Sequence, residues 1–160
     1  MAREPQIFSQ GDWSFEFEPW SAWIRNVRWR GETVLVGIYC AIRGESWTTY
    51  RVETSDYKIS ENHLTLKADC ADAPFSWDIE IRFGEDWLSY EINGRAAHAF
   101  RTARTGLCVL HPTEPRDYFV GHPDGRRERI ILPNSIQPHQ PFTDVQSLEW
   151  TGANGATTAI

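Results

Sequence analysis

Short apolar runs that alternate with polar residues are the feature that most restricts the fold of this chain. The segment 75–83, FSWDIEIRF, has apolar residues at odd positions and polar residues at even positions. A β-strand points successive side chains to opposite faces, so this pattern indicates a strand with one buried face. The segment 13–18, WSFEFE, alternates in the same way. Such runs, ended by Gly, Pro, Asn or Asp, predict strands rather than helices.

Related signals recur along the chain. The segment 34–42, VLVGIYCAI, is apolar at both parities, as expected of a central strand that is covered on both faces. Asn93-Gly94 is a strong signal for a type I′ hairpin turn. We count about a dozen short strands, a number that favours two antiparallel sheets packed face to face with Greek-key or jelly-roll connections. The predicted class is therefore all-β, an antiparallel two-sheet β-sandwich.

Length and composition bound the number of domains. The 160 residues suffice for one ordinary domain with one core and are too few for two. We therefore expect a single β-sandwich domain over residues 1–150. Residues 151–160, TGANGATTAI, turn small and polar, and they predict an exposed tail or a linker cut short before further domains.

Charge and cysteine content argue against several classes of protein. The net charge of −6 argues against nucleic-acid binding, which needs clustered Lys and Arg. The three cysteines are widely spaced and form no C-x-x-C pair, so they indicate neither a disulfide framework nor a zinc ribbon. The N-terminus lacks the apolar core of a signal peptide, and no apolar run of about eighteen residues occurs. We expect a cytoplasmic protein that binds no membrane.

Three histidines beside prolines fall within one segment, 104–142: His111, His122 and His139. Proline fixes the backbone and stops regular strand pairing, so each imidazole is expected at a strand end or in a loop, where folds usually place binding chemistry. An imidazole titrates near neutral pH and can give or take a proton on a sugar or lactone oxygen. These three histidines are the candidate catalytic residues.

Three further residues of this segment supply charge or hydrogen-bonding capacity and are candidate substrate-binding residues: Arg104, Asp124 and Gln140. Asp124 also has a sufficient structural explanation, because Asp124-Gly125 is turn chemistry. A histidine in a rigid loop can likewise serve only to satisfy backbone carbonyls. The histidines lie too far apart in sequence for the H-x-H or H-x-x-x-H spacing of common ligand motifs, so we predict neither a metal site nor a cofactor.

Three segments of this region resemble the N-terminal part of the D-apionate lactonase family, bacterial enzymes of apiose catabolism: RTGLCVLHP at 104–112, GHPDG at 121–125 and SIQPHQPFTDVQSL at 135–148. The resemblance continues to Ile160. It implies a β-sandwich similar in outline to the mutarotase-like supersandwich, followed by a barrel-like middle domain and a C-terminal β domain.

The same resemblance implies hydrolysis of a branched sugar-acid lactone, D-apionolactone, to the open acid. The implied partners are a small-molecule sugar lactone or sugar acid and further domains of the same enzyme. The chain stops at Ile160, where such an enzyme would continue. Whether this chain alone has lactone hydrolase activity is therefore open.

Two other functions remain open on the sequence. A non-catalytic carbohydrate-binding module would hold a sugar by stacking it on one of several tryptophans, for which core packing is an alternative: Trp20, Trp23, Trp47 or Trp87. A small mutarotase-like enzyme would use histidine acid–base chemistry, an idea that depends on analogy of fold. Histidines gathered in one pocket would favour chemistry, whereas exposed tryptophans on one sheet would favour binding.

Overall fold

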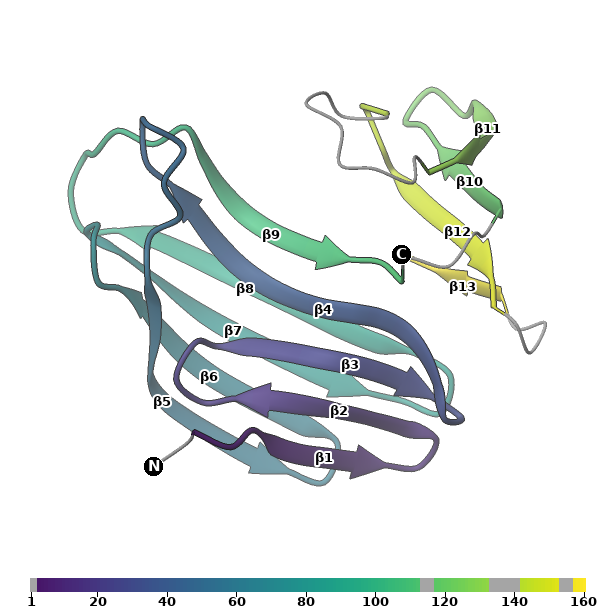
Figure 1. Cartoon of the computed structure of the whole chain (residues 1–160), viewed down its shortest axis with the longest axis horizontal. Coiled ribbons are helices and arrows are strands. Elements are labelled where there is room, and N and C mark those ends of the chain that lie inside the picture. The colour runs from purple at the N-terminus through teal and green to yellow at the C-terminus, as the bar shows by residue number, and fades with distance from the viewer. Residues whose placement is uncertain (1–2, 113–116, 133–141, 153–156) are drawn as a thin grey trace. The chain divides into compact units, whose positions relative to one another are not determined.

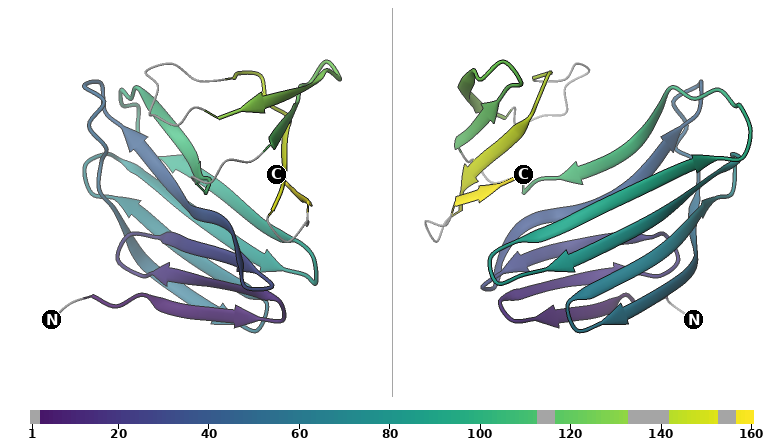
Figure 2. Two further views of the ribbon diagram at one scale, coloured as in Figure 1. Left: turned by 45° about the vertical axis from the view of Figure 1, so that its right-hand side comes forward. Right: turned by 180° about the vertical axis from the view of Figure 1, so that it is seen from behind.

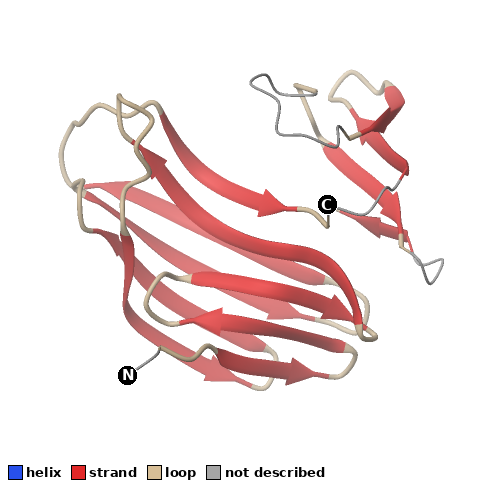
Figure 3. Ribbon diagram, in the orientation of Figure 1, coloured by secondary structure: helices blue, strands red, loops and turns tan. Residues whose placement is uncertain are grey.

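The computed structural model describes residues 3–112, 117–132, 142–152 and 157–160. Within these residues every regular element is a β-strand, and all sheets are antiparallel (Figure 3). The predicted all-β class is confirmed. None of the described residues belongs to a helix with the length and apolarity needed to cross a bilayer. The chain divides into two compact units, Met1–His111 (unit 1) and Pro112–Ile160 (unit 2).

Unit 1 consists of two antiparallel sheets that face each other as layers (Figures 1 and 2). The five-stranded sheet has the order β1-β2-β3-β4-β9. Its strands are β1 (Gln6–Gln10), β2 (Trp13–Glu18), β3 (Trp23–Trp29), β4 (Glu32–Arg43) and β9 (Arg104–Leu110). The four-stranded sheet has the order β5-β6-β7-β8, with β5 (Val52–Ser60), β6 (His63–Cys70), β7 (Phe75–Phe83) and β8 (Leu88–Ala96). The chain therefore leaves the first sheet after β4, builds the second, and returns as β9.

The core of unit 1 lies between the two sheets, and the alternation of the strands explains it. In β7 the odd positions from Trp77 to Phe83 are buried, while Asp78 and Arg82 are exposed. The rings of Phe8 and Phe15 from the first sheet stack on Phe83 from the second, with centroids 4.8 and 5.2 Å away. Stacked pairs of this kind add about 0.5–1.5 kcal/mol beyond the burial of their area. The predicted β-sandwich is thus held by aromatic contacts across its layers.

The apolar segment 34–42 forms most of β4, and the prediction of a central strand is confirmed. β4 pairs with β3 on one side and with β9 on the other. Ile38 and Ile42 are buried on the side of the core, and Leu35 and Ala41 are also buried. A Cβ atom at position 37 would lie 3.1 Å from the backbone oxygen of Ile24, so a larger residue would require a small shift of β3.

The predicted turn at Asn93-Gly94 is wrong. Both residues lie inside β8, where Asn93 pairs with Asp78 and Gly94 pairs with Trp77. A Cβ atom at position 94 would lie 2.6 Å from Cζ of Phe75. The glycine is explained by the phenylalanine ring that packs over it, since glycine inside a strand also marks a close approach of this kind.

Unit 2 is a single antiparallel sheet with the order β11-β10-β12-β13. Its strands are β10 (Asp117–Gly121), β11 (Arg127–Ile131), β12 (Ser147–Thr151) and β13 (Thr157–Ala159). One face of this sheet is buried and consists of Tyr118, Val120, Leu148 and Trp150. The Tyr118 and Trp150 side chains are cross-strand neighbours with ring centroids 5.7 Å apart.

The end of the chain takes part in this sheet. β13 pairs with β12, and Ile160 and Leu148 exchange two backbone hydrogen bonds of 2.9 Å each. The last residues of the segment 151–160, for which an exposed tail or linker was predicted, therefore include a short edge strand. The single β-sandwich domain over residues 1–150 stays a prediction.

Candidate functional site

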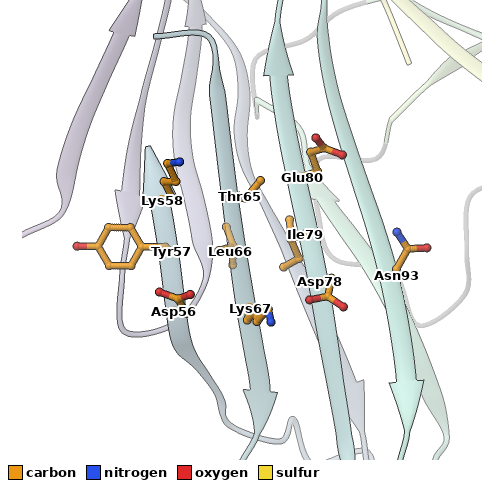
Figure 4. Close-up of a pocket in the computed structure, with 10 residues that line it drawn as sticks. All are labelled: Asp56, Tyr57, Lys58, Thr65, Leu66, Lys67, Asp78, Ile79, Glu80 and Asn93. Carbon is orange, nitrogen blue, oxygen red and sulfur yellow. The ribbon is translucent and has the colours of Figure 1, made fainter. Parts of the chain in front are cut away.

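The outer face of the four-stranded sheet of unit 1 carries an open hollow of about 280 Å³ (Figure 4). Polar side chains from all four strands line it: Asp56, Lys58, Thr65, Lys67, Asp78, Glu80 and Asn93. Lys67 is the cross-strand neighbour of Asp56 on one side and of Asp78 on the other. Opposite charges placed in this way support the sheet. The hollow offers many hydrogen-bonding groups to a polar ligand, but its charges are largely balanced.

Glu80 is the centre of a charged cluster on this face. His63 Nε2 and Arg82 Nη2 both lie 2.6 Å from the same carboxylate oxygen. Partial desolvation raises the pKa of the Glu80 carboxyl, but hydrogen bonds from Arg82 and His63 outweigh it, and the net shift is downward. Glu80 is thereby kept ionised near neutral pH. The Glu80 carboxylate can accept hydrogen bonds from ligand hydroxyls but is poorly suited to donate a proton.

In unit 2, His122 is almost completely buried, with 5% of its surface exposed. Its Nδ1 lies 2.9 Å from the backbone oxygen of Asp144. A carbonyl only accepts, so Nδ1 carries the hydrogen. The other ring nitrogen, Nε2, lies 3.6 Å from a carboxylate oxygen of Glu128. Both nitrogens thus face groups of the protein, an arrangement that anchors the loop after β10.

Asp124 occupies the tight connection between β10 and β11. Its carboxylate accepts hydrogen bonds from the backbone N–H of Arg126 at 3.0 Å and from Arg126 Nε at 2.8 Å. These bonds lower the pKa of the Asp124 carboxyl. Gly125, with a φ of 84°, adopts a conformation that favours glycine. The structural explanation of Asp124 as a turn residue is therefore present in the structure.

The structure brings only some of the predicted site residues together. His122 and Asp124 share one loop of unit 2, whereas Arg104 and His111 lie at opposite ends of β9 in unit 1. A strand rises roughly 3.3 Å per residue, so Arg104 and His111 are separated by about 20 Å. His139 and Gln140 lie outside the described residues.

Comparison with known proteins identifies the family of this chain. The family model for the N-terminal domain of D-apionate lactonase matches residues 1–160. The chain belongs to this family. The resemblance predicted from the segments after Arg104 is thus confirmed, and it extends over the whole chain.

A curated relative of this N-terminal domain is the D-apionate lactonase of Brucella anthropi, which is 27% identical over 146 residues. The aligned part covers 84% of this chain and 24% of the relative. The chain thus spans about a quarter of the length of the curated enzyme that it matches. No solved structure matches the chain.

The tryptophans of this D-apionate lactonase N-terminal domain differ in what they offer to a ligand. Trp47 and Trp87 are 58% and 50% exposed. Trp23 stacks on Tyr39 with ring centroids 3.8 Å apart, and the Arg25 guanidinium lies 4.0 Å from the centre of the Trp23 ring. Side chains of the same chain, Tyr39 and Arg25, therefore already contact the Trp23 ring.

Sequence reasoning missed one neighbour of Arg104. The register of β4 and β9 places Arg43 directly opposite Arg104, and the Arg104 guanidinium lies 5.5 Å from the centre of the Trp47 ring. No local pattern indicates such a grouping, because it depends on which distant strands pair. An arginine at the end of an apolar strand was the only signal available.

The cysteines of unit 1 are free thiols, and Cys40 lies in the core. Among the described residues, no three His, Cys, Asp or Glu side chains are grouped in a way that could hold a metal ion. Burial raises the pKa of the Cys40 thiol to about 12, with a smaller contribution from Cys108, against a hydrogen bond with Tyr90 that lowers it. Burial and the neighbouring Cys40 also raise the pKa of Tyr90.

These buried acids predict the response of unit 1 to alkaline pH. The unfolded Cys40 thiol ionises near pH 9, whereas the folded one stays neutral until about pH 12. Its stabilising contribution is complete below pH 9 and is lost between these values, at about 1.4 kcal/mol per pH unit. Urea unfolding followed over this range should show a smaller pH slope for Cys40→Ala, and the remaining slope includes Tyr90 and Tyr39, whose pKa values burial also raises. Equal slopes for the two proteins would contradict the burial of an unionised thiol.

Proposed function

We propose that this chain is the N-terminal domain of a longer enzyme that hydrolyses a branched sugar-acid lactone, D-apionolactone, in carbohydrate catabolism. The observation that carries the proposal is the family match over residues 1–160. The chain covers 24% of a relative named D-apionate lactonase, which supports the presence of further domains in the same enzyme. The free cysteines are consistent with a reducing compartment, and we place the enzyme in the cytoplasm.

The proposed reaction sets clear chemical requirements. The oxygen of a water molecule attacks the lactone carbonyl carbon, the ring C–O bond breaks, and a proton is delivered to the leaving alkoxide. A base must activate the water, hydrogen-bond donors must stabilise the oxyanion, and an acid must protonate the leaving oxygen. The carboxylic acid that forms ionises at neutral pH, so each turnover releases one proton into solution.

The assignment of these roles to residues of this domain is part of the proposal. Proton transfer is assigned to His111, His122 or His139, and stabilisation of the oxyanion to Arg104 or a backbone N–H. Asp124 and Gln140 are the further substrate-binding candidates. His111 follows the last residue of β9 and is half-buried. His122, by contrast, is 5% exposed and also suits a purely structural role in its loop.

We expect the longer protein, and not the 160-residue chain, to hydrolyse D-apionolactone. Arg104 and His111 lie at opposite ends of one strand of unit 1, so these two residues are not arranged to act together on one small substrate, and His122 of unit 2 is buried. Proton release at constant pH measures the rate of hydrolysis by each of the two proteins. Turnover by the 160-residue chain above the spontaneous rate would contradict the expectation that only the longer protein is active.

The same assay tests the histidines. Double substitution of His122 and His139 in the longer protein should abolish turnover if either transfers protons. Replacement of the exposed His98 by glutamine is the matched control and should leave the rate unchanged. Full activity of the double variant would remove His122 and His139 from the assignment, leaving His111 to be tested, while the lactonase proposal would stay intact.

A further inference from the structure

One tryptophan of unit 1 is displayed to solvent in an unfavourable backbone conformation. Trp47 lies in the connection between β4 and β5, is 58% exposed, and has a φ of 65°. Positive φ is rare for a bulky residue. Two backbone hydrogen bonds, Trp47 N–H to the Gly44 oxygen at 2.8 Å and Gly44 N–H to the Thr48 oxygen at 2.9 Å, hold the turn. Strained conformations that the surrounding structure maintains cluster at ligand sites.

A second unfavourable feature lies at the same place. Arg43 and Arg104 are direct cross-strand neighbours, and like charges in this position weaken strand pairing. The Arg43 guanidinium donates to the Thr49 hydroxyl at 2.7 Å. Within the described part of the chain, neither arginine forms an ion pair with a carboxylate. Among the residues that the structure describes, no carboxylate thus offsets these two positive charges, in a chain of net charge −6.

The backbone around the arginine pair is fixed by one side chain. The Thr102 hydroxyl lies 2.8 Å from the backbone oxygen of Arg43 and 2.9 Å from that of Arg104. Glu45, two residues before Trp47, contacts Arg101 at 3.6 Å, and both side chains are well exposed. Such exposed ion pairs contribute little to the free energy of folding. Glu45 is thus paired with Arg101 rather than with Arg43 or Arg104.

The ring and the charge are close enough to act on one ligand. The Arg104 guanidinium lies 5.5 Å from the centre of the Trp47 ring. Unlike Trp23, whose ring contacts both Tyr39 and Arg25, Trp47 keeps more than half of its surface open to solvent. A ligand that packs on the exposed part of the indole therefore lies close to the guanidinium, which itself lies over the ring.

We propose that Trp47, Arg104 and Arg43 form a binding site for a sugar that bears a carboxylate. The C–H face of the sugar ring packs on the indole, which presents a rigid apolar surface. The carboxylate accepts hydrogen bonds from the planar guanidinium of Arg104, whose fork of donors matches its two oxygens. Bound carboxylate relieves the repulsion between Arg43 and Arg104. The site does not depend on the lactonase proposal.

The test compares two sugars that differ only in the carboxylate, methyl glucuronide and methyl glucoside. Each is titrated into the 160-residue chain while NMR records the indole N–H signals, with that of Trp47 identified by its absence in Trp47→Ala. The glucuronide should shift this signal with an affinity about tenfold higher than the glucoside, as expected for a hydrogen bond to a charged group.

Variants separate the two parts of the site. Arg104→Gln should remove the preference for the glucuronide. Trp47→Ala should lower the affinity for both sugars by about three- to tenfold, and Trp47→Phe should restore it. Trp87→Ala is the matched control, because Trp87 is 50% exposed and precedes β8, at the end of the sandwich away from the β4–β5 connection (Figure 1). This control should leave both affinities unchanged.

Three results would overturn the proposal. Equal affinities for the two sugars would show that the carboxylate is not recognised. The same shift with acetate at the same affinity would show a general anion site without sugar recognition. Absence of any change at the Trp47 signal with either sugar would show that the exposed ring has no role in binding.

Discussion

Replacement of Phe15 by alanine is expected to lower the free energy of unfolding of unit 1 by about 3–5 kcal/mol. Phe15 is 2% exposed, and its ring contacts Phe8 at 4.8 Å in its own sheet and Phe83 at 5.2 Å in the opposite sheet. The substitution removes one of three mutually stacked rings and leaves a cavity that closes only if the two sheets shift toward each other. Since domains are commonly stable by about 5–15 kcal/mol, the loss is a large part of the total.

Urea unfolding followed by fluorescence measures this loss. Ile7→Ala on the neighbouring strand is the matched control, because Ile7 is 80% exposed, and it should change stability by no more than about 0.5 kcal/mol. A Phe15→Ala protein as stable as the Ile7→Ala protein would mean that the aromatic stack does not hold the two sheets together.

Replacement of Trp150 by alanine is expected to have an effect of similar size, about 3–5 kcal/mol, confined to unit 2. Trp150 is 1% exposed and is the largest side chain on the buried face of a sheet whose strands are short. Removing it takes away the ring whose centre lies 5.7 Å from that of Tyr118. We expect the strands β10 to β13 to open while the sandwich of unit 1 remains folded.

Hydrogen exchange resolved by residue distinguishes the two units. Amides of β10 and β12 should lose their protection in Trp150→Ala, and amides of β6 and β7 should keep theirs. Ile131→Ala, at a position 79% exposed in β11, serves as the control and should preserve protection throughout. Loss of protection in both units together would show that they unfold as one cooperative body.

The strands were predictable where a short stretch of sequence determines the outcome. Alternation at 13–18 and 75–83 corresponds to β2 and β7, and the apolar segment 34–42 is the central strand β4. Asn93-Gly94 misled because the same dipeptide suits a hairpin turn and a strand on which a ring must pack. Here the glycine makes room for the ring of Phe75. That ring lies over Gly94 only because β7 pairs with β8, which the dipeptide alone does not reveal.

The candidate site was less predictable, for the same physical reason. Asp124 was recognised as a turn residue because its partners are two residues away. The burial of His122 depends on its contact with the backbone of Asp144, which local sequence does not reveal. The cross-strand pair of Arg43 and Arg104 likewise depends on a pairing between strands that are distant in the chain.

The path of the chain through unit 1 also determines the order in which its strands can form their backbone hydrogen bonds. β9 can pair with β4 only by closing a loop that contains the whole four-stranded sheet, and such closure costs more entropy than a hairpin. Until β9 arrives, β4 presents an unpaired apolar edge, the kind of surface on which chains aggregate. A chain shortened before Arg104 would keep that edge permanently, so β9 protects the solubility of the domain as well as supplying Arg104.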